Sequence, residues 1–84
     1  MKYVLIADDN KDITDILSVY VEKEGYTPVI AKDGIETERK FDEYAPSAVL
    51  LDVMMPLKDG YEVCRSIRAK SGVPIILITA RGED

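Results

Sequence analysis

Residues 3–10 read YVLIADDN, an apolar run that ends in two acidic residues and an asparagine. Its first five residues, Tyr3 to Ala7, form an almost continuous apolar run, which is typical of a parallel strand covered on both faces. The pattern returns in three later runs, TPVIA at 27–31, AVLL at 48–51 and IILIT at 75–79. Because helix-like stretches separate the runs, we expect the order βαβαβαβ and an α/β fold with helices on both faces of a parallel sheet.

Helical periodicity supports the intervening elements. The third stretch places Val63, Cys64 and Ile67 on one face, and we expect Cys64 to be a core residue rather than a redox group. The first stretch is capped by Asn10 and ends at Gly25. Its apolar stripe consists of Ile13, Ile16, Leu17, Tyr20 and Val21.

The second helix is expected from Ile35 to about Tyr44, and its apolar face is poor because Thr37 and Glu38 interrupt it. The strand before this helix contains Pro28, which has no N–H to donate. We therefore expect that strand at an edge of the sheet.

The composition excludes several classes of function. The 84 residues suit one globular domain, and 11 Lys+Arg against 16 Asp+Glu give a net charge of −5. This charge speaks against direct binding of nucleic acid or of an anionic membrane. Without His, the chain has no histidine base, histidine metal ligand or phosphohistidine of its own. A single Cys excludes an internal disulfide and fits a cytoplasmic location, and no apolar run is long enough to span a membrane.

Polar residues follow the strands at one end of the expected sheet. Asp8 and Asp9 follow the first strand. Asp52 follows the third, and Thr79 ends the fourth. In a flavodoxin-like strand order, 2-1-3-4, the first and third strands are neighbours at the switch point, where ligands bind beyond the carboxyl ends. We expect the three carboxylates and the hydroxyl to converge there; the alternative is that Asp8 and Asp9 only cap the first helix beside Asn10.

Converging carboxylates repel one another. Two unit charges about 4 Å apart repel by roughly 4 kcal/mol at an effective dielectric constant of about 20. A hard divalent cation removes this repulsion, and a site of few carboxylates with bound water suits Mg²⁺. With the cation present, Asp52 can act as the nucleophile of phosphoryl transfer, and Thr79 can donate a hydrogen bond. Metal storage without chemistry is the alternative.

Three segments, VLIADDN, VLLDVMMPLKDGYEVCRSIR and VPIILITARGED, together resemble the receiver domain of two-component response regulators, over the whole 84 residues. The resemblance implies that Asp52 is the phosphoacceptor and receives its phosphoryl group from a sensor histidine kinase. It implies Mg²⁺ ligation by Asp9 and Asp52, by Asp8 through water, and by the backbone carbonyl of Met54. It also implies that Thr79 is the switch hydroxyl, which turns toward the phosphoryl group after transfer.

The second and third segments are most similar to regulators that carry a winged-helix DNA-binding domain, but DNA binding is not carried over to this chain. The family's Lys after a fifth strand has no counterpart, and Lys58 and Lys70 are weak substitutes on surface-like segments. Thr37 and Glu38 replace residues that are usually apolar. The second helix is therefore expected either to dock weakly or to face something other than the normal core.

The strand pattern indicates that residues 1–84 are one domain, the N-terminal portion of a receiver, without the fifth strand and last two helices; these would need on the order of 40 further residues. The strand at 75–79 would then be an uncharged edge, through which we expect self-association as a dimer or by exchange of segments. Two functions stay open. One is a phosphorylatable switch with impaired activity, catalysing at most its own phosphorylation and dephosphorylation. The other is a self-associating module that no longer switches.

Overall fold

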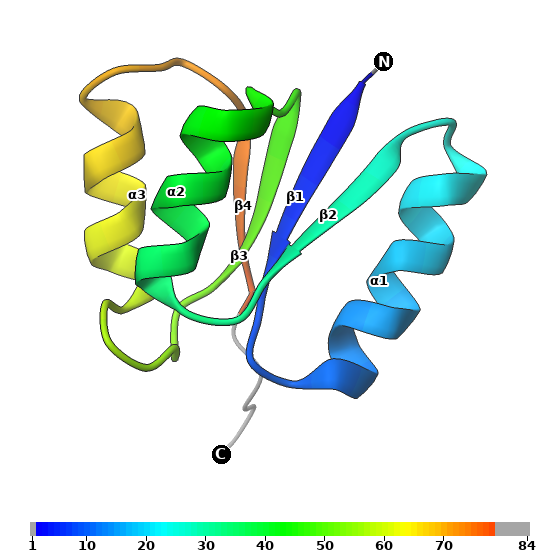
Figure 1. Cartoon of the computed structure of the whole chain (residues 1–84), viewed down its shortest axis with the longest axis horizontal. Helices are drawn as coiled ribbons and strands as arrows, with labels where there is room; N and C mark the ends of the chain where they lie inside the picture. Colours follow the sequence, from blue (N-terminus) through cyan, green and yellow to red (C-terminus); the bar gives the residue numbers. More distant parts are fainter. Residues whose placement is uncertain (1, 79–84) are drawn as a thin grey trace.

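The computed structural model describes residues 2–78 (Figure 1). Strands and helices alternate in the predicted order. The elements are β1 (Tyr3–Ala7), α1 (Lys11–Lys23), β2 (Thr27–Ala31), α2 (Gly34–Tyr44), β3 (Ala48–Asp52), α3 (Gly60–Arg68) and β4 (Ile75–Ile78). The fourth strand was expected to include Thr79, which lies outside the described residues.

The strands form one parallel sheet in the order β2-β1-β3-β4, which confirms the flavodoxin-like arrangement. β2 lies at an edge, as predicted from Pro28, because an edge position tolerates the missing N–H. In the central pair, Ala7 of β1 lies beside Leu51 of β3. The residues that follow these two positions therefore share one rim of the sheet.

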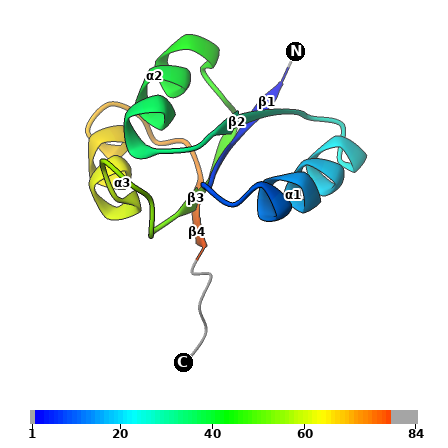
Figure 2. The ribbon, with the colours of Figure 1, turned by 60° about the horizontal axis from the view of Figure 1, so that its bottom comes forward.

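The helices divide unequally between the two faces of the sheet. Figure 1 and Figure 2 show α2 and α3 on one side and α1 alone on the other. Side chains alternate along each strand, so successive residues enter different cores. The core beneath α1 is small and consists of Val4, Ile6 and Val21. The core beneath α2 and α3 is larger and consists of Leu5, Ala7, Val29, Ala31, Phe41, Val49, Leu51, Met55, Val63 and Ile67.

The predicted stripe of α1 is wrong in part. Val21 is buried, but Ile16 and Tyr20 are exposed, and Thr14 is buried in place of an apolar residue. Among residues 2–78, α1 is the one helix on this face of the sheet, and it packs on β1 and β2. A narrower stripe is therefore enough to cover the sheet, and the outer apolar side chains stay in solvent.

For α2, both expectations are wrong, because the helix packs on β1 and β2 and contributes Phe41 to the larger core. Thr37 is completely buried, and its Oγ1 donates a hydrogen bond of 2.7 Å to the Asp33 carbonyl. Phe41, one turn later, enters the larger core. Ile35, where this helix was expected to begin, is exposed. None of the helices among residues 2–78 is long and apolar enough to cross a membrane.

Candidate functional site

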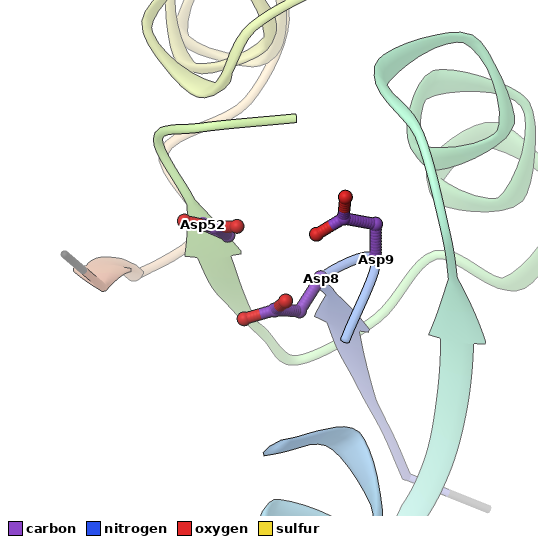
Figure 3. A group of neighbouring side chains, drawn as sticks. All are labelled: Asp8, Asp9 and Asp52. Atoms are coloured by element: carbon purple, nitrogen blue, oxygen red, sulfur yellow. The ribbon is translucent and has the colours of Figure 1, made fainter. Parts of the chain in front are cut away.

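Three carboxylates meet at the carboxyl ends of the two central strands, as predicted. Asp52 is the last residue of β3, and Asp8 and Asp9 follow β1 directly. One oxygen of each carboxylate lies within 4.8 Å of an oxygen of each of the others. Figure 3 shows the three side chains around the space between the two strand ends. The parallel pairing of β1 with β3 produces this cluster, because it aligns the ends of both strands.

Two of the carboxylates are buried, and each has one oxygen held by a backbone N–H. Asp8 and Asp52 are 2% and 3% exposed, whereas Asp9 is exposed. The N–H of Asn10 donates to Asp8 Oδ1 at 2.9 Å, and the N–H of Met54 donates to Asp52 Oδ1 at 3.1 Å. Asp8 Oδ2 is buried without a hydrogen-bond partner. Such an acceptor is costly unless a further group satisfies it.

Burial raises the pKa of Asp8 above its ordinary value of 3.8, and the charges of Asp52 and Asp9 raise it further. The hydrogen bond from Asn10 opposes this shift, because it stabilises the ionised form. The N-cap of α1 is Asn10 itself, whose Oδ1 accepts from the N–H of Asp12 at 2.9 Å. Helix capping therefore does not account for Asp8.

A divalent cation fits this set of residues. The cluster supplies hard carboxylate oxygens, which Mg²⁺ prefers, and one of them is a buried acceptor without a partner. A bound cation would satisfy that oxygen and offset the mutual repulsion that raises the pKa of Asp8.

A model of the response regulator receiver domain matches residues 4–84. The chain belongs to this family. Its structure is similar to the BeF3-activated N-terminal receiver domain of RstA from Klebsiella pneumoniae, with a TM-score of 0.90 and 29% sequence identity, covering 99% of this chain and 71% of that one. It is also similar to the N-terminal domain of a response regulator receiver protein from Methanoculleus marisnigri JR1, with a TM-score of 0.87 and 30% identity, covering 100% of this chain and 71% of that one. The chemotaxis protein CheY4 of Vibrio cholerae matches with a TM-score of 0.87 and 29% identity, covering 99% of this chain and 72% of that one.

The remaining residues that the sequence suggested for the site of this receiver domain are Met54, Thr79 and two lysines. The N–H of Met54 donates a hydrogen bond to the Asp52 carboxylate. Ligation of Mg²⁺ by the Met54 carbonyl stays a prediction. Thr79 lies outside the described residues. Lys58 and Lys70 form ion pairs outside the acidic cluster, with Glu38 at 2.8 Å and with Asp42 at 2.6 Å.

Two solvent-open hollows flank Asp9 of the receiver. One, of about 230 Å³, lies on the α1 side and is also lined by Asp8 and Lys32. The other, of about 610 Å³, lies beside the loop after β3 and is also lined by Met54 and Tyr61. A ligand can therefore approach the acidic cluster from either side of Asp9.

Two glycines that support the site were missed in the sequence. A Cβ atom on Gly60 would overlap the carbonyl oxygen of Asp52, and one on Gly34 would overlap the carbonyl oxygen of Lys58. Each glycine starts a helix and follows an Asp that caps it, Asp33 or Asp59. The repeated Asp-Gly pair was a usable signal: it marks two helix starts that approach the backbone after β3.

Proposed function

We propose that this receiver domain accepts a phosphoryl group on Asp52 from a sensor histidine kinase, with Mg²⁺ held by Asp8, Asp9 and Asp52. The observation that carries the proposal is the convergence of three carboxylates, two of them buried, at one rim of the sheet. The alternative, storage of metal ions without a reaction, would need only an exposed acidic patch. Here a buried carboxylate oxygen is left without a partner, which supports a site built for a ligand.

One hydrogen bond to the Asp52 side chain suits it for attack on phosphorus. The N–H of Met54 holds Oδ1 and so restrains the carboxylate plane. An Asp52 oxygen would form the new P–O bond while the P–N bond of the kinase phosphohistidine breaks, and the bonding electron pair leaves on the imidazole nitrogen. When bound, Mg²⁺ supplies neutralisation of charge on the phosphoryl oxygens. Asp8 and Asp9 would orient the phosphoryl group through the cation that they hold.

Fluorine NMR of beryllofluoride, a phosphoryl mimic, tests this proposal. The wild-type chain should bind beryllofluoride only when Mg²⁺ is present. The Asp52→Asn variant should lose the bound signal, because the mimic attaches to the carboxylate. Equal binding by wild type and Asp52→Asn would contradict the assignment of Asp52.

Other parts of the proposal rest on the sequence. Thr79 would act as the switch hydroxyl, and the Met54 carbonyl would complete the protein ligands of Mg²⁺. The receiver would work in the cytoplasm, and it would be of the kind that accompanies winged-helix output domains. The Thr79→Ala variant checks the first point: it should still become phosphorylated on Asp52 but fail to change conformation on doing so.

A second candidate function is self-association with another copy of this chain, through β4. Among residues 2–78, β4 forms one edge of the sheet, and Ile75–Ile78 contains no charge or proline. Ile76 and Leu77 are 57% and 40% exposed. Unprotected apolar edges of this kind pair with other strands. Antiparallel pairing of two β4 strands would join both sheets around a two-fold axis.

Analytical ultracentrifugation over a concentration series checks this second candidate. The wild-type chain should form dimers, and the Ile76→Lys variant should shift toward the monomer, because a charge on an edge strand disfavours pairing. A wild-type chain that stays monomeric up to high micromolar concentration would contradict self-association.

A further inference from the structure

We propose that the ion pair between Glu38 and Lys58 is a positioning device for the acidic site. It holds the loop of residues 53–59 (the 53–59 loop) against α2, and through this loop it sets the affinity of the site for Mg²⁺. The inference rests on the proposed function, because it concerns the same cation. It gives a role to Glu38, which otherwise weakens the apolar face of α2.

The two side chains meet in a partly shielded place. Lys58 Nζ lies 2.8 Å from Glu38 Oε2, and the side chains are 32% and 23% exposed. Glu38 Oε2 itself is buried and accepts no hydrogen bond, so the Lys58 ammonium is its charge partner. Because water screens such a pair less than one in open solvent, its loss should be felt more than the loss of an ordinary surface ion pair.

Backbone contacts bring α2 to the same loop. The N–H of Gly34 donates to the Pro56 carbonyl at 3.4 Å. A Cβ on Gly34 would overlap the carbonyl oxygen of Lys58, so only glycine permits this approach. The start of α2 and the Glu38 side chain, one turn further along the helix, therefore contact neighbouring points of the 53–59 loop.

The backbone between these points is strained. Leu57 has a φ of 71°, and the N–H of Lys58 donates to the Pro56 carbonyl at 2.8 Å, which closes a γ-turn. A non-glycine residue persists in this conformation only when its surroundings impose it. Leu57 is exposed and makes no core contact, so the constraint comes from its neighbours, and Lys58 is anchored to Glu38.

The other end of the 53–59 loop carries the site. Val53 accepts a hydrogen bond of 3.1 Å from the N–H of Gly60, and Met54 donates to the Asp52 carboxylate. Movement of the loop away from α2 would move the Met54 peptide relative to Asp52. Groups that orient metal ligands commonly change metal affinity by about 10- to 100-fold when they are removed.

Titration of the metal-free chain with Mg²⁺ alone tests the inference, and amide NMR signals monitor the binding. Glu38→Gln and Lys58→Gln should each weaken Mg²⁺ binding by about 3- to 10-fold, because the pair is partly exposed. Long-range electrostatics alone would act in opposite directions: loss of Glu38 would weaken cation binding, and loss of Lys58 would strengthen it. The reversed pair, Glu38→Lys with Lys58→Glu, should restore the affinity to within about twofold of wild type.

The chain offers a matched control. Lys70 Nζ lies 2.6 Å from Asp42, so this pair also ties α2 to a segment beside α3, but near the end of α2 that lies away from Gly34. Asp42→Asn breaks it and should leave Mg²⁺ affinity unchanged. If Asp42→Asn weakens Mg²⁺ binding as much as Glu38→Gln does, the effect is general docking of α2, and the positioning role is overturned.

A second measurement keeps the inference separate from the proposed function. Hydrogen exchange of the Met54 N–H in the metal-free chain should be about 3- to 10-fold faster in Glu38→Gln and Lys58→Gln, but not in Asp42→Asn. Mg²⁺ binding by wild type with equal affinity in all variants would overturn the positioning role and leave the proposed function intact. A wild-type chain that does not bind Mg²⁺ would overturn both.

Discussion

Leu51 and Asp52 are consecutive residues of β3, and both are almost completely buried, at 0% and 3% exposure. Burial has opposite consequences for the two. Leu51 enters the larger core beneath α2 and α3, where removal of apolar surface from water stabilises the fold. Asp52 lies at the rim beside Asp8 and Asp9, where the carboxylates repel one another and a bound cation would offset that repulsion. In this receiver one strand thus supplies stability from its interior and a carboxylate of the acidic cluster from its end.

The contrast between stabilising apolar burial and costly polar burial also holds between the body of the sheet and its rim. The strands contribute apolar side chains to two cores. Their backbone N–H and C=O groups pair with those of neighbouring strands. At the rim, Asp8 keeps a buried oxygen without a partner. An arrangement that costs stability in the absence of a ligand is expected where a ligand binds.

The largest expected effect comes from the interior of β3. Leu51→Ala should lower the free energy of unfolding by about 2 to 5 kcal/mol, because it leaves a cavity in the larger core. Leu50→Ala is the matched control on the neighbouring position, which faces α1 and is only partly buried; it should cost about 1 to 2 kcal/mol. Urea denaturation measures both, and an equal cost would show that the two faces are equally well packed.

At the rim, the sign of the effect should reverse. Asp8→Asn should raise the free energy of unfolding of the metal-free chain by about 1 kcal/mol, because it removes a buried, repelled charge and replaces the unpaired oxygen with a donor. The same variant should bind Mg²⁺ more weakly. Urea denaturation with and without Mg²⁺ checks the pair of effects, and a metal-free Asp8→Asn variant less stable than wild type would contradict the comparison.

The advantage of Asp8→Asn should depend on pH. The folded state raises the pKa of Asp8 above 3.8, chiefly through burial, so the folded chain holds this proton at a pH where the unfolded chain has lost it. The contribution of Asp8 to the free energy of unfolding therefore falls as the pH rises from 3.8 through the raised pKa. In EDTA, the stability difference between Asp8→Asn and wild type should be largest at neutral pH and shrink on acidification. A difference that grows on acidification would be evidence against the raised pKa.

The smallest effect is expected on the outer surface of α1. Ile16 is 56% exposed, and Ile16→Ser should change the free energy of unfolding by no more than about 0.5 kcal/mol. Val21 is the control on the same helix: it is buried in the smaller core, and Val21→Ala should cost about 1 kcal/mol or more. If Ile16→Ser destabilises as much as Val21→Ala, then α1 is covered on its outer side, which would fit an associated state.

Much of the fold and of the site could be predicted because both depend on short-range patterns. Apolar runs of strand length, the N-cap Asn10 and the edge position of Pro28 are local features, and the structure confirms them. The convergence of Asp8, Asp9 and Asp52 followed from the rule that parallel strands end at a common rim. No knowledge of side-chain packing was needed for that step.

The tertiary structure decided which side of each helix is buried and what the polar residues of α2 contact. Ile16 and Tyr20 belong to the apolar stripe of α1 by periodicity, yet they are exposed, since within residues 2–78 no other helix packs beside α1 on that face. Glu38 weakens the stripe of α2 by the same reasoning, yet it pairs with Lys58, twenty residues further along the chain. Periodicity records only the spacing within one element. Which element packs on each helix face depends on segments distant in sequence, and so does the burial of Asp8 Oδ2. The assembled fold therefore decides whether a given side chain stabilises or destabilises the folded state.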